Sequence, residues 1–453
     1  MKIKRRFSLS TTQMILLSFL LAIFCGTVLL TLPISSATGE CVSFIDALFT
    51  ATTATCVTGL VVVPTVSTWS IFGQIVILFL IQIGGLGIIT VMSGIILSIN
   101  RKMKLSDSIL IQDAFNLNTM SGLGRFLKKV IIGTCIVEGC GALLYMIAFI
   151  PKFGPRGIYY SIFTSISAFC NAGIDIIAED SLCSFVGDPI VNITTCLLVI
   201  LGGIGYIVWW DVIRVIKQRR EKKGGLFKRL TLHSKIAISS TLILIISGAI
   251  MFFMFEYNNP STMKDLSLYE KIQASFFQSV TTRTAGFATI PQENLTTPSA
   301  LFSLLLMFIG GSPVGTAGGV KTVTIATLLL AAISAVKNKN QVTIFNRKIS
   351  KAAISKSIAV FATSFSIMFI STLLLSCFTQ ADLIDVLYET VSATATVGLT
   401  RALTPTLNLA GKIIITATMY LGRVGPISLA IAFITKKENQ NIVSDPTEEI
   451  SVG

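Results

Sequence analysis

Four related turns decide the fold of this chain, and they read Thr55-Cys-Val-Thr-Gly59-Leu60, Phe169-Cys-Asn-Ala-Gly173-Ile174, Thr282-Arg-Thr-Ala-Gly286-Phe287 and Thr394-Ala-Thr-Val-Gly398-Leu399. Their glycines are separated by 114, 113 and 112 residues. A second motif follows each turn in the next apolar stretch, as Ile83-Gly84-Gly85, Leu201-Gly202-Gly203, Ile309-Gly310-Gly311 and Leu421-Gly422-Arg423. Four matches in register, for two motifs, indicate an internal fourfold repeat.

The composition places most of the chain in lipid. Of its 453 residues, 52% are hydrophobic and 13% are charged, and the mean hydropathy is +0.79. A soluble chain of this length needs more charged residues to cover its surface. Crossing a bilayer takes about 20 apolar residues. Eight stretches are long enough, at residues 12–33, 71–98, 129–150, 190–216, 234–256, 299–335, 354–378 and 410–435.

The positive charge is distributed as a topology signal. The formal net charge is +14, and most Lys and Arg residues cluster before the first span, within 98–130, 214–235 and 336–356, and just after residue 435. An excess of basic residues marks cytoplasmic loops. We therefore predict a multi-pass protein of the cell membrane with both termini in the cytoplasm. A nucleic-acid partner is not expected, because the basic clusters are separated by membrane spans.

Between the two spans of each pair lies a shorter apolar stretch that leads into the glycine turn, at 43–55, 157–169, 269–281 and 383–395. Helices of this length are too short to span the bilayer and are candidates for re-entrant segments. The predicted fold is therefore an all-α membrane protein with four parallel span–pore helix–filter turn–span repeats around a central pore. We expect the repeats at residues 1–100, 101–217, 218–336 and 337–453.

The four turns are candidates for a cation filter. Glycine allows a backbone carbonyl to point at a central ion, and rings of carbonyls can replace the ion's hydration shell. Pore helices pointing their carboxyl ends at the same place would favour a cation. The predicted filter residues are Val57, Thr58, Gly59, Asn171, Ala172, Gly173, Thr284, Ala285, Gly286, Thr396, Val397 and Gly398.

Other conspicuous residues have two interpretations. In the second glycine motif, we interpret four glycines as sites of close helix packing and not as ion-binding residues: Gly84, Gly85, Gly202 and Gly203. Two carboxylates, Asp46 and Asp385, each lie 13 residues before a filter glycine. We interpret them first as stabilisers of the pore-helix ends and second as cation attractors at the mouth.

The sixth apolar stretch, 299–335, predicts a broken helix. As one helix it would be about 55 Å long, far beyond a 30 Å hydrocarbon core. Its middle contains five glycines and a proline within 310–319. Irregular backbone at membrane depth must line a wet cavity or be buried in protein. The predicted gate therefore comprises Gly310, Gly311, Ser312, Pro313, Gly315, Thr316, Gly318, Gly319, Lys321 and Arg423, the last two being charges at membrane depth. For Lys321, an extended side chain that reaches the cytoplasmic surface is an equal alternative.

With these motifs, the sequence resembles the Trk/Ktr/HKT superfamily of potassium transporters, and within it the membrane subunits of Ktr systems. The resemblance covers almost the whole chain. It implies potassium as substrate, a filter glycine in each repeat, and a gating loop in the third repeat with Arg423 near it. It also implies a homodimer on a cytosolic ring of nucleotide-binding regulatory subunits.

An enzyme is not expected, because no nucleophile–base pair is evident. No cofactor is expected within this chain, and no metal site beyond potassium, because the chain has one histidine and no CxxC motif. The main alternative function is a sodium- or proton-coupled secondary cation transporter, although parallel fourfold repeats favour a pore. Pairing of Cys41 with Cys183 stays open, and so does the role of Glu138, which has no evident partner.

Overall fold

The computed structural model describes residues 11–87, 123–218, 225–339 and 341–425, which form helices apart from one short hairpin. The first repeat contains α1 Thr11–Leu30, η1 Pro33–Ser35, α2 Phe44–Cys56, α3 Thr65–Thr68 and α4 Ile71–Leu86. The second contains α7 Leu123–Phe153, α8 Arg156–Cys170, η2 Cys183–Phe185, α9 Pro189–Gly203 and α10 Tyr206–Lys217. The third contains α11 Leu226–Arg229, α12 Leu232–Glu256, α13 Leu268–Thr281, α14 Thr297–Phe308 and α15 Thr322–Val336. The fourth contains β1 Thr343–Ile344, β2 Arg347–Lys348, α16 Lys351–Ser376, α17 Leu383–Ala395, η4 Thr404–Thr406 and α18 Leu409–Val424.

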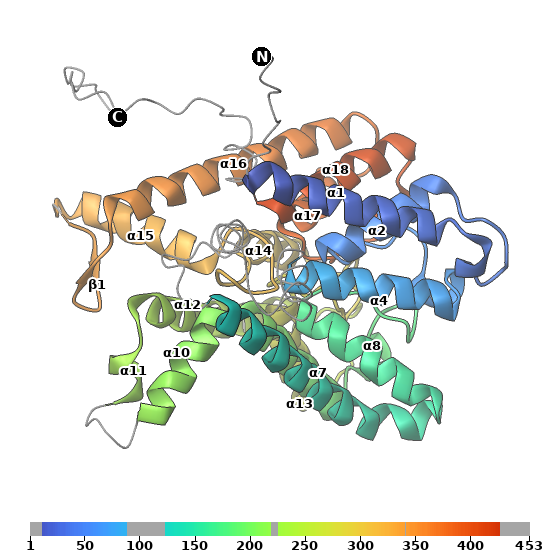
Figure 1. Ribbon diagram of the computed structural model, residues 1–453, viewed down its shortest axis with the longest axis horizontal. Coiled ribbons are helices and arrows are strands. Elements are labelled where there is room, and N and C mark those ends of the chain that lie inside the picture. Colours follow the sequence, from blue (N-terminus) through green and yellow to red (C-terminus); the bar gives the residue numbers. More distant parts are fainter. Residues whose placement is uncertain (1–10, 88–122, 219–224, 340, 426–453) are drawn as a thin grey trace, which may run out of the picture.

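The four repeats close into a ring. In each repeat the helix after the turn packs against the pore helix of the next repeat, as α4 on α8, α9 on α13, α14 on α17 and α18 on α2. The last of these contacts joins the fourth repeat to the first, and Figure 1 shows red α18 beside blue α1 and α2. The α1–α2 and α7–α8 connections lie at one end of the molecule, opposite α11 and the β1–β2 hairpin (Figure 1). The predicted all-α fold of four parallel repeats is confirmed.

All four pore helices are α-helical within one residue of the predicted bounds, as α2, α8, α13 and α17. Serine side chains cap the start of two of them: the Ser43 side chain accepts the Asp46 amide at α2, and Ser267 forms a capping box with Glu270 at α13. Three of the helices end where the next residue takes a left-handed conformation, at Val57, Asn171 and Thr396. Each helix therefore stops at the start of its filter turn.

The predicted span over 190–216 is not one straight helix. This span breaks between α9 and α10, which are bent by 95°. At the break Gly205 has φ +92°, and a β-carbon there would overlap the carbonyl oxygen of Pro313. The amide of the next residue, Tyr206, donates to the Val314 carbonyl at 2.9 Å. The bend therefore makes room for the loop of the third repeat.

Two other helices that follow a turn end within the predicted spans. Helices α4 and α18 end before Gly87 and Gly425, which have φ of 84° and 93°. The remaining parts of the predicted spans 71–98 and 410–435, and both chain ends, lie outside the described residues. The predicted break within 299–335 is confirmed, because α14 ends at Phe308 and α15 starts at Thr322.

Four helices of the described residues are long and apolar enough to cross a membrane, and they are the first span of each repeat. The bent pair α9–α10 would make a fifth span. These helices expose large apolar side chains, such as Leu21 at 62% and Ile243 at 65%. Apolar surface of this kind is stable against lipid. The shorter apolar helices α4, α14 and α15 pack against these longer helices.

Candidate functional site

The four predicted filter glycines meet at one point. A β-carbon on any of them would overlap or crowd a carbonyl oxygen of the neighbouring repeat. The contacts run around the ring, from Gly59 to Ala172, from Gly173 to Ala285, from Gly286 to Val397 and from Gly398 to Thr58. Only a residue without a side chain fits here, and each glycine lies beside a carbonyl from the next turn.

The turns share an unusual backbone conformation. Two residues in each have positive φ: the glycine, at 63° to 97°, and the residue two positions earlier, at 51° to 67°. The earlier residue is Val57, Asn171, Thr284 or Thr396. Positive φ is rare for residues with a side chain, and most of all for β-branched ones such as Val57. Such strain persists where the surroundings enforce it, commonly at functional sites.

Hydroxyl groups of the pore helices hold these turns in place. Gly59 donates its amide to Thr53 Oγ1 at 2.9 Å, and Gly398 donates to Ser392 Oγ at 3.0 Å. Ser167 and Thr281 instead donate to the carbonyls of the residues that follow the other two glycines, both at 2.5 Å. Sequence reasoning missed this set, although a hydroxyl residue five or six positions before each glycine was visible.

Some buried polar atoms at the turns have no hydrogen-bond partner among the described residues. They include oxygen or nitrogen atoms in the side chains of Thr58, Asn171 and Thr396. Buried polar atoms without partners are rare in folded proteins. These three side chains belong to the predicted filter, so the same segments provide both carbonyls and unsatisfied side chains.

A cavity of about 540 Å³ opens on one side of the glycines and is lined by all four of them. Four acidic residues also line it: Asp175, Glu179, Asp180 and Glu293. Asp175 lies in the loop after the second turn, and burial raises the pKa of its carboxyl to about 6. A wet cavity with this charge attracts cations to the glycine ring.

On the other side of the ring lies the loop between α14 and α15, which contacts the second, third and fourth repeats. Ser312 and Thr316 donate their amides to the carbonyls of Gly203 and Gly202, at 2.8 and 3.1 Å. The Gly318 amide donates to Thr284 Oγ1 at 3.2 Å, so the loop reaches the third filter turn. A β-carbon on Gly318 would overlap Thr396, which brings the loop against the fourth turn as well.

Arg423 links this loop to the first repeat. Its guanidinium donates to the Thr316 carbonyl at 2.7 Å and to the Gly84 carbonyl at 2.5 Å. Arg423 therefore lies against the loop, where the resemblance places it. Lys321 does not extend to the surface, because its Nζ donates to the Ala317 carbonyl at 2.6 Å.

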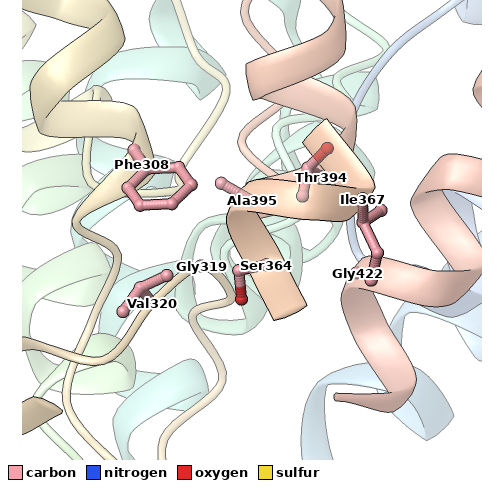
Figure 2. Close-up of a pocket in the computed structure, with 8 residues that line it drawn as sticks. All are labelled: Phe308, Gly319, Val320, Ser364, Ile367, Thr394, Ala395 and Gly422. Carbon is pink, nitrogen blue, oxygen red and sulfur yellow. The ribbon is translucent and has the colours of Figure 1, made fainter. Parts of the chain in front are cut away.

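Small cavities flank the loop. One of about 20 Å³ lies between Gly319 and Val320 on one side and Thr394, Ala395 and Gly422 on the other (Figure 2). A second, of about 10 Å³, lies on the opposite side beside Gly311. The first is large enough for about one water molecule. The loop is thus enclosed but not packed tightly on either flank.

Two buried charges near the turns acquire partners. Glu138 accepts from Gln82 Nε2 at 3.2 Å and contacts the Cys170 thiol at 3.8 Å, next to the second turn. Arg283 was not singled out from the sequence, yet it is 6% exposed within the third turn. It donates to the Gly310 carbonyl at 3.4 Å, at the base of the loop.

The remaining sequence interpretations are resolved by contacts. Asp46 and Asp385 lie in the first turns of α2 and α17 and are paired with Lys412 and Arg401, at 2.6 and 2.7 Å. This fits the first interpretation, stabilisation of the pore-helix ends. The packing interpretation of the second motif is confirmed, because a β-carbon on Gly84 or Gly202 would overlap a pore-helix carbonyl oxygen. Cys41 and Cys183 are both free thiols.

Together these features define a class of protein. A ring of four parallel repeats brings glycine turns, carbonyls and free polar atoms to one axial point, below an acidic cavity and above a loop. This arrangement matches the requirements of a cation pathway through a membrane. The chain belongs to the TrkH family of cation transport proteins, because a model of that family matches residues 3–445.

Individual relatives cover nearly the full length. The chain is 40% identical to Ktr system potassium uptake protein B of Bacillus subtilis, over 97% of this chain and 96% of that protein. It is 36% identical to potassium/sodium uptake protein NtpJ of Enterococcus hirae, over 100% and 99%. The fold is similar to the crystal structure of the potassium transporter TrkH from Vibrio parahaemolyticus, with a TM-score of 0.76, 16% identity, and coverage of 96% and 87%.

Proposed function

We propose that this protein takes up potassium across the cell membrane through a filter made of its four glycine turns. The observation that carries the proposal is the ring in which each filter glycine lies against a carbonyl of the next repeat. Carbonyls from four chain segments around one axis replace the water shell of a cation. Potassium itself is supported by the relatives, whose names include potassium uptake.

The loop at 310–320 is proposed as the gate, and Arg423 as the group that holds it shut. The loop lies directly against the third and fourth turns, where it blocks the axis on the side opposite the acidic cavity. Its only regular backbone pairing in the described residues joins Ile309 to Val320 at its base. A guanidinium beside the path also repels an incoming cation. Movement of this loop with Arg423 would remove both barriers.

Further parts of the proposal rest on resemblance. We propose repeat boundaries at 1–100, 101–217, 218–336 and 337–453, with both termini in the cytoplasm. We also propose a homodimer that binds a cytosolic ring of nucleotide-binding subunits. Nucleotide binding by those subunits would then control the gate. Coupling to sodium is the second candidate function, and it is favoured by the relative that is named a potassium/sodium uptake protein.

The test is potassium uptake by the purified full chain in proteoliposomes, with sodium varied on the outside. We expect saturable potassium uptake that sodium inhibits weakly as a competitor. Uptake that stops when sodium is removed would favour the coupled transporter. Liposomes that accumulate neither ion with this chain, alone or with a regulatory subunit, would contradict the proposal.

A further inference from the structure

A carboxylate is buried directly behind the outer end of the fourth turn. Glu389 lies on α17 with no exposed surface, and it is not among the residues that the sequence singles out. Its two carboxylate oxygens accept hydrogen bonds from Thr400 Oγ1 at 2.7 Å and from Thr404 Oγ1 at 2.5 Å. Among the described residues no Lys, Arg or His nitrogen lies within 4.0 Å of it. Both of its partners are therefore neutral hydroxyls.

The two hydroxyls belong to the segment that leaves the filter. Thr400 comes two residues after Gly398, and it lines the cavity of about 540 Å³ together with that glycine and Leu399. Between the two threonines, Arg401 is held by Asp385 at 2.7 Å and by the carbonyls of Gln292 and Leu295. Two carboxylates of α17, Asp385 and Glu389, therefore hold the Thr400–Thr404 segment on the side away from the cavity.

This arrangement is specific to one repeat. Nine positions before the filter glycine, where α17 has Glu389, the other repeats have Thr50, Thr164 and Phe277. A buried ionised group is expensive unless its hydrogen bonds are satisfied. Breaking either hydrogen bond would leave a buried polar atom of Glu389 without a partner, so the two threonines are held in place.

We propose that Glu389 is a positioning residue that sets ion preference by fixing the outer end of the fourth filter turn through Thr400 and Thr404. This inference rests on the proposed function, because it assumes that the turns select the ion. Coordination by backbone carbonyls depends on their spacing around the ion. A looser Gly398–Thr400 segment would let the ring adjust to the smaller sodium ion, so discrimination would fall while transport continued.

The experiment compares potassium uptake with sodium as competitor in proteoliposomes that contain the full chain at matched protein content. Thr400→Val removes one hydroxyl without changing the shape of the side chain, and Glu389→Gln keeps the size but replaces one acceptor oxygen with a donor. Each should lower the preference for potassium over sodium by roughly threefold to tenfold, the range of one ordinary hydrogen bond. Thr400→Ser keeps the hydroxyl and should recover most of the preference that Thr400→Val loses.

The matched control is Thr390→Val. Thr390 is the next residue on α17, but its hydroxyl bonds to Thr372 at 2.8 Å, away from the filter, so ion preference should not change. The double variant Glu389→Gln with Thr400→Val should lose no more preference than the worse single variant, because the two share one interaction. Parental preference in both single variants, or additive losses in the double variant, would overturn the inference. A parent chain that shows no potassium preference would instead contradict the proposed function.

Discussion

Individual glycines of the filter ring differ in how much a side chain would disturb them. Gly59 and Gly398 have φ of 97° and 96°, outside the range that other residues adopt, whereas Gly173 has φ of 63°. A β-carbon at any of the four would overlap a carbonyl oxygen of the adjoining turn. Because the overlap is common to all four, the backbone angle sets the difference, and the cost of a serine is greatest at Gly59 and Gly398.

We predict that Gly59→Ser and Gly398→Ser lower the potassium-to-sodium preference about tenfold or more, which corresponds to about 1.4 kcal/mol. Gly286→Ser should have a similar effect, and Gly173→Ser the smallest. The measurement is competition between the two ions in uptake assays at matched expression. If all four serine variants keep the parental preference, the four turns are not the filter.

The guanidinium of Arg423 makes two hydrogen bonds in different directions, to the third repeat and to the first. We predict that Arg423→Ala speeds initial potassium uptake severalfold, because the loop loses its link to the ring and the path loses a cation. Arg423→Lys should be intermediate, since an ammonium keeps the charge but cannot reproduce the planar fork. Slower uptake in the alanine variant would instead assign Arg423 to the fold or to the conducting state.

Among the elements, part of the loop at 310–320 can be deleted without changing the helices on either side of it. A β-carbon on Gly311 would overlap the side chain of Ala317, so these two residues lie side by side. Removing residues 312–316 leaves the pairing of Ile309 with Val320 intact and eliminates the hydrogen bonds that Ser312 and Thr316 donate to the second repeat. The chain would therefore rejoin without rebuilding α14 or α15.

We predict that this deletion raises potassium uptake and makes it less dependent on a regulatory subunit. The control is Thr327→Val on α15, whose hydroxyl bonds only within its own helix, to the Val323 carbonyl. Membrane content is measured for both variants by quantitative immunoblotting. A deletion variant that reaches the membrane at the parental level but conducts less than the parent would make the loop a structural part of the pore.

Element lengths were predictable where the sequence contains local stop signals and not where a distant contact sets the end. The pore helix 383–395 was predicted to the residue, because a polar start and a glycine turn bound it. The bend after α9 was not predicted, because its cause is the third-repeat loop, more than a hundred residues away in sequence. For the same reason Glu389 was missed: its partners lie beyond the filter turn, and its burial follows from the ring.

For the molecule as a whole, closure of the ring depends on contacts between its first and last repeats. One of them is the ion pair between Asp46 on α2 and Lys412 on α18, at 2.6 Å, with side chains 17% and 18% exposed. We predict that Asp46→Asn costs about 1–2 kcal/mol, between the values typical of exposed and buried pairs. The thermal midpoint in detergent should fall accordingly, while the KM for potassium should stay the same.

The matched double variant Asp46→Lys with Lys412→Asp reverses the pair and should restore part of the lost stability. A raised KM for potassium in Asp46→Asn, with an unchanged thermal midpoint, would favour the second interpretation of Asp46 as a cation attractor. The order of the repeats and their parallel orientation could be predicted from the glycine register alone. The pairing of Asp46 with Lys412 could not, because it joins residues 366 positions apart.

Within the described residues, an irregular loop between two helices lies against the glycine ring in the third repeat, and the fourth repeat has Arg423 where the other three have a glycine. In a pore assembled from four identical subunits, any mutation is copied into every quarter, so such features would collide at the centre. A single chain that contains four diverged copies escapes this constraint. Each repeat can acquire its own mutations. One asymmetric loop can then close a pore whose ion is still coordinated by all four repeats.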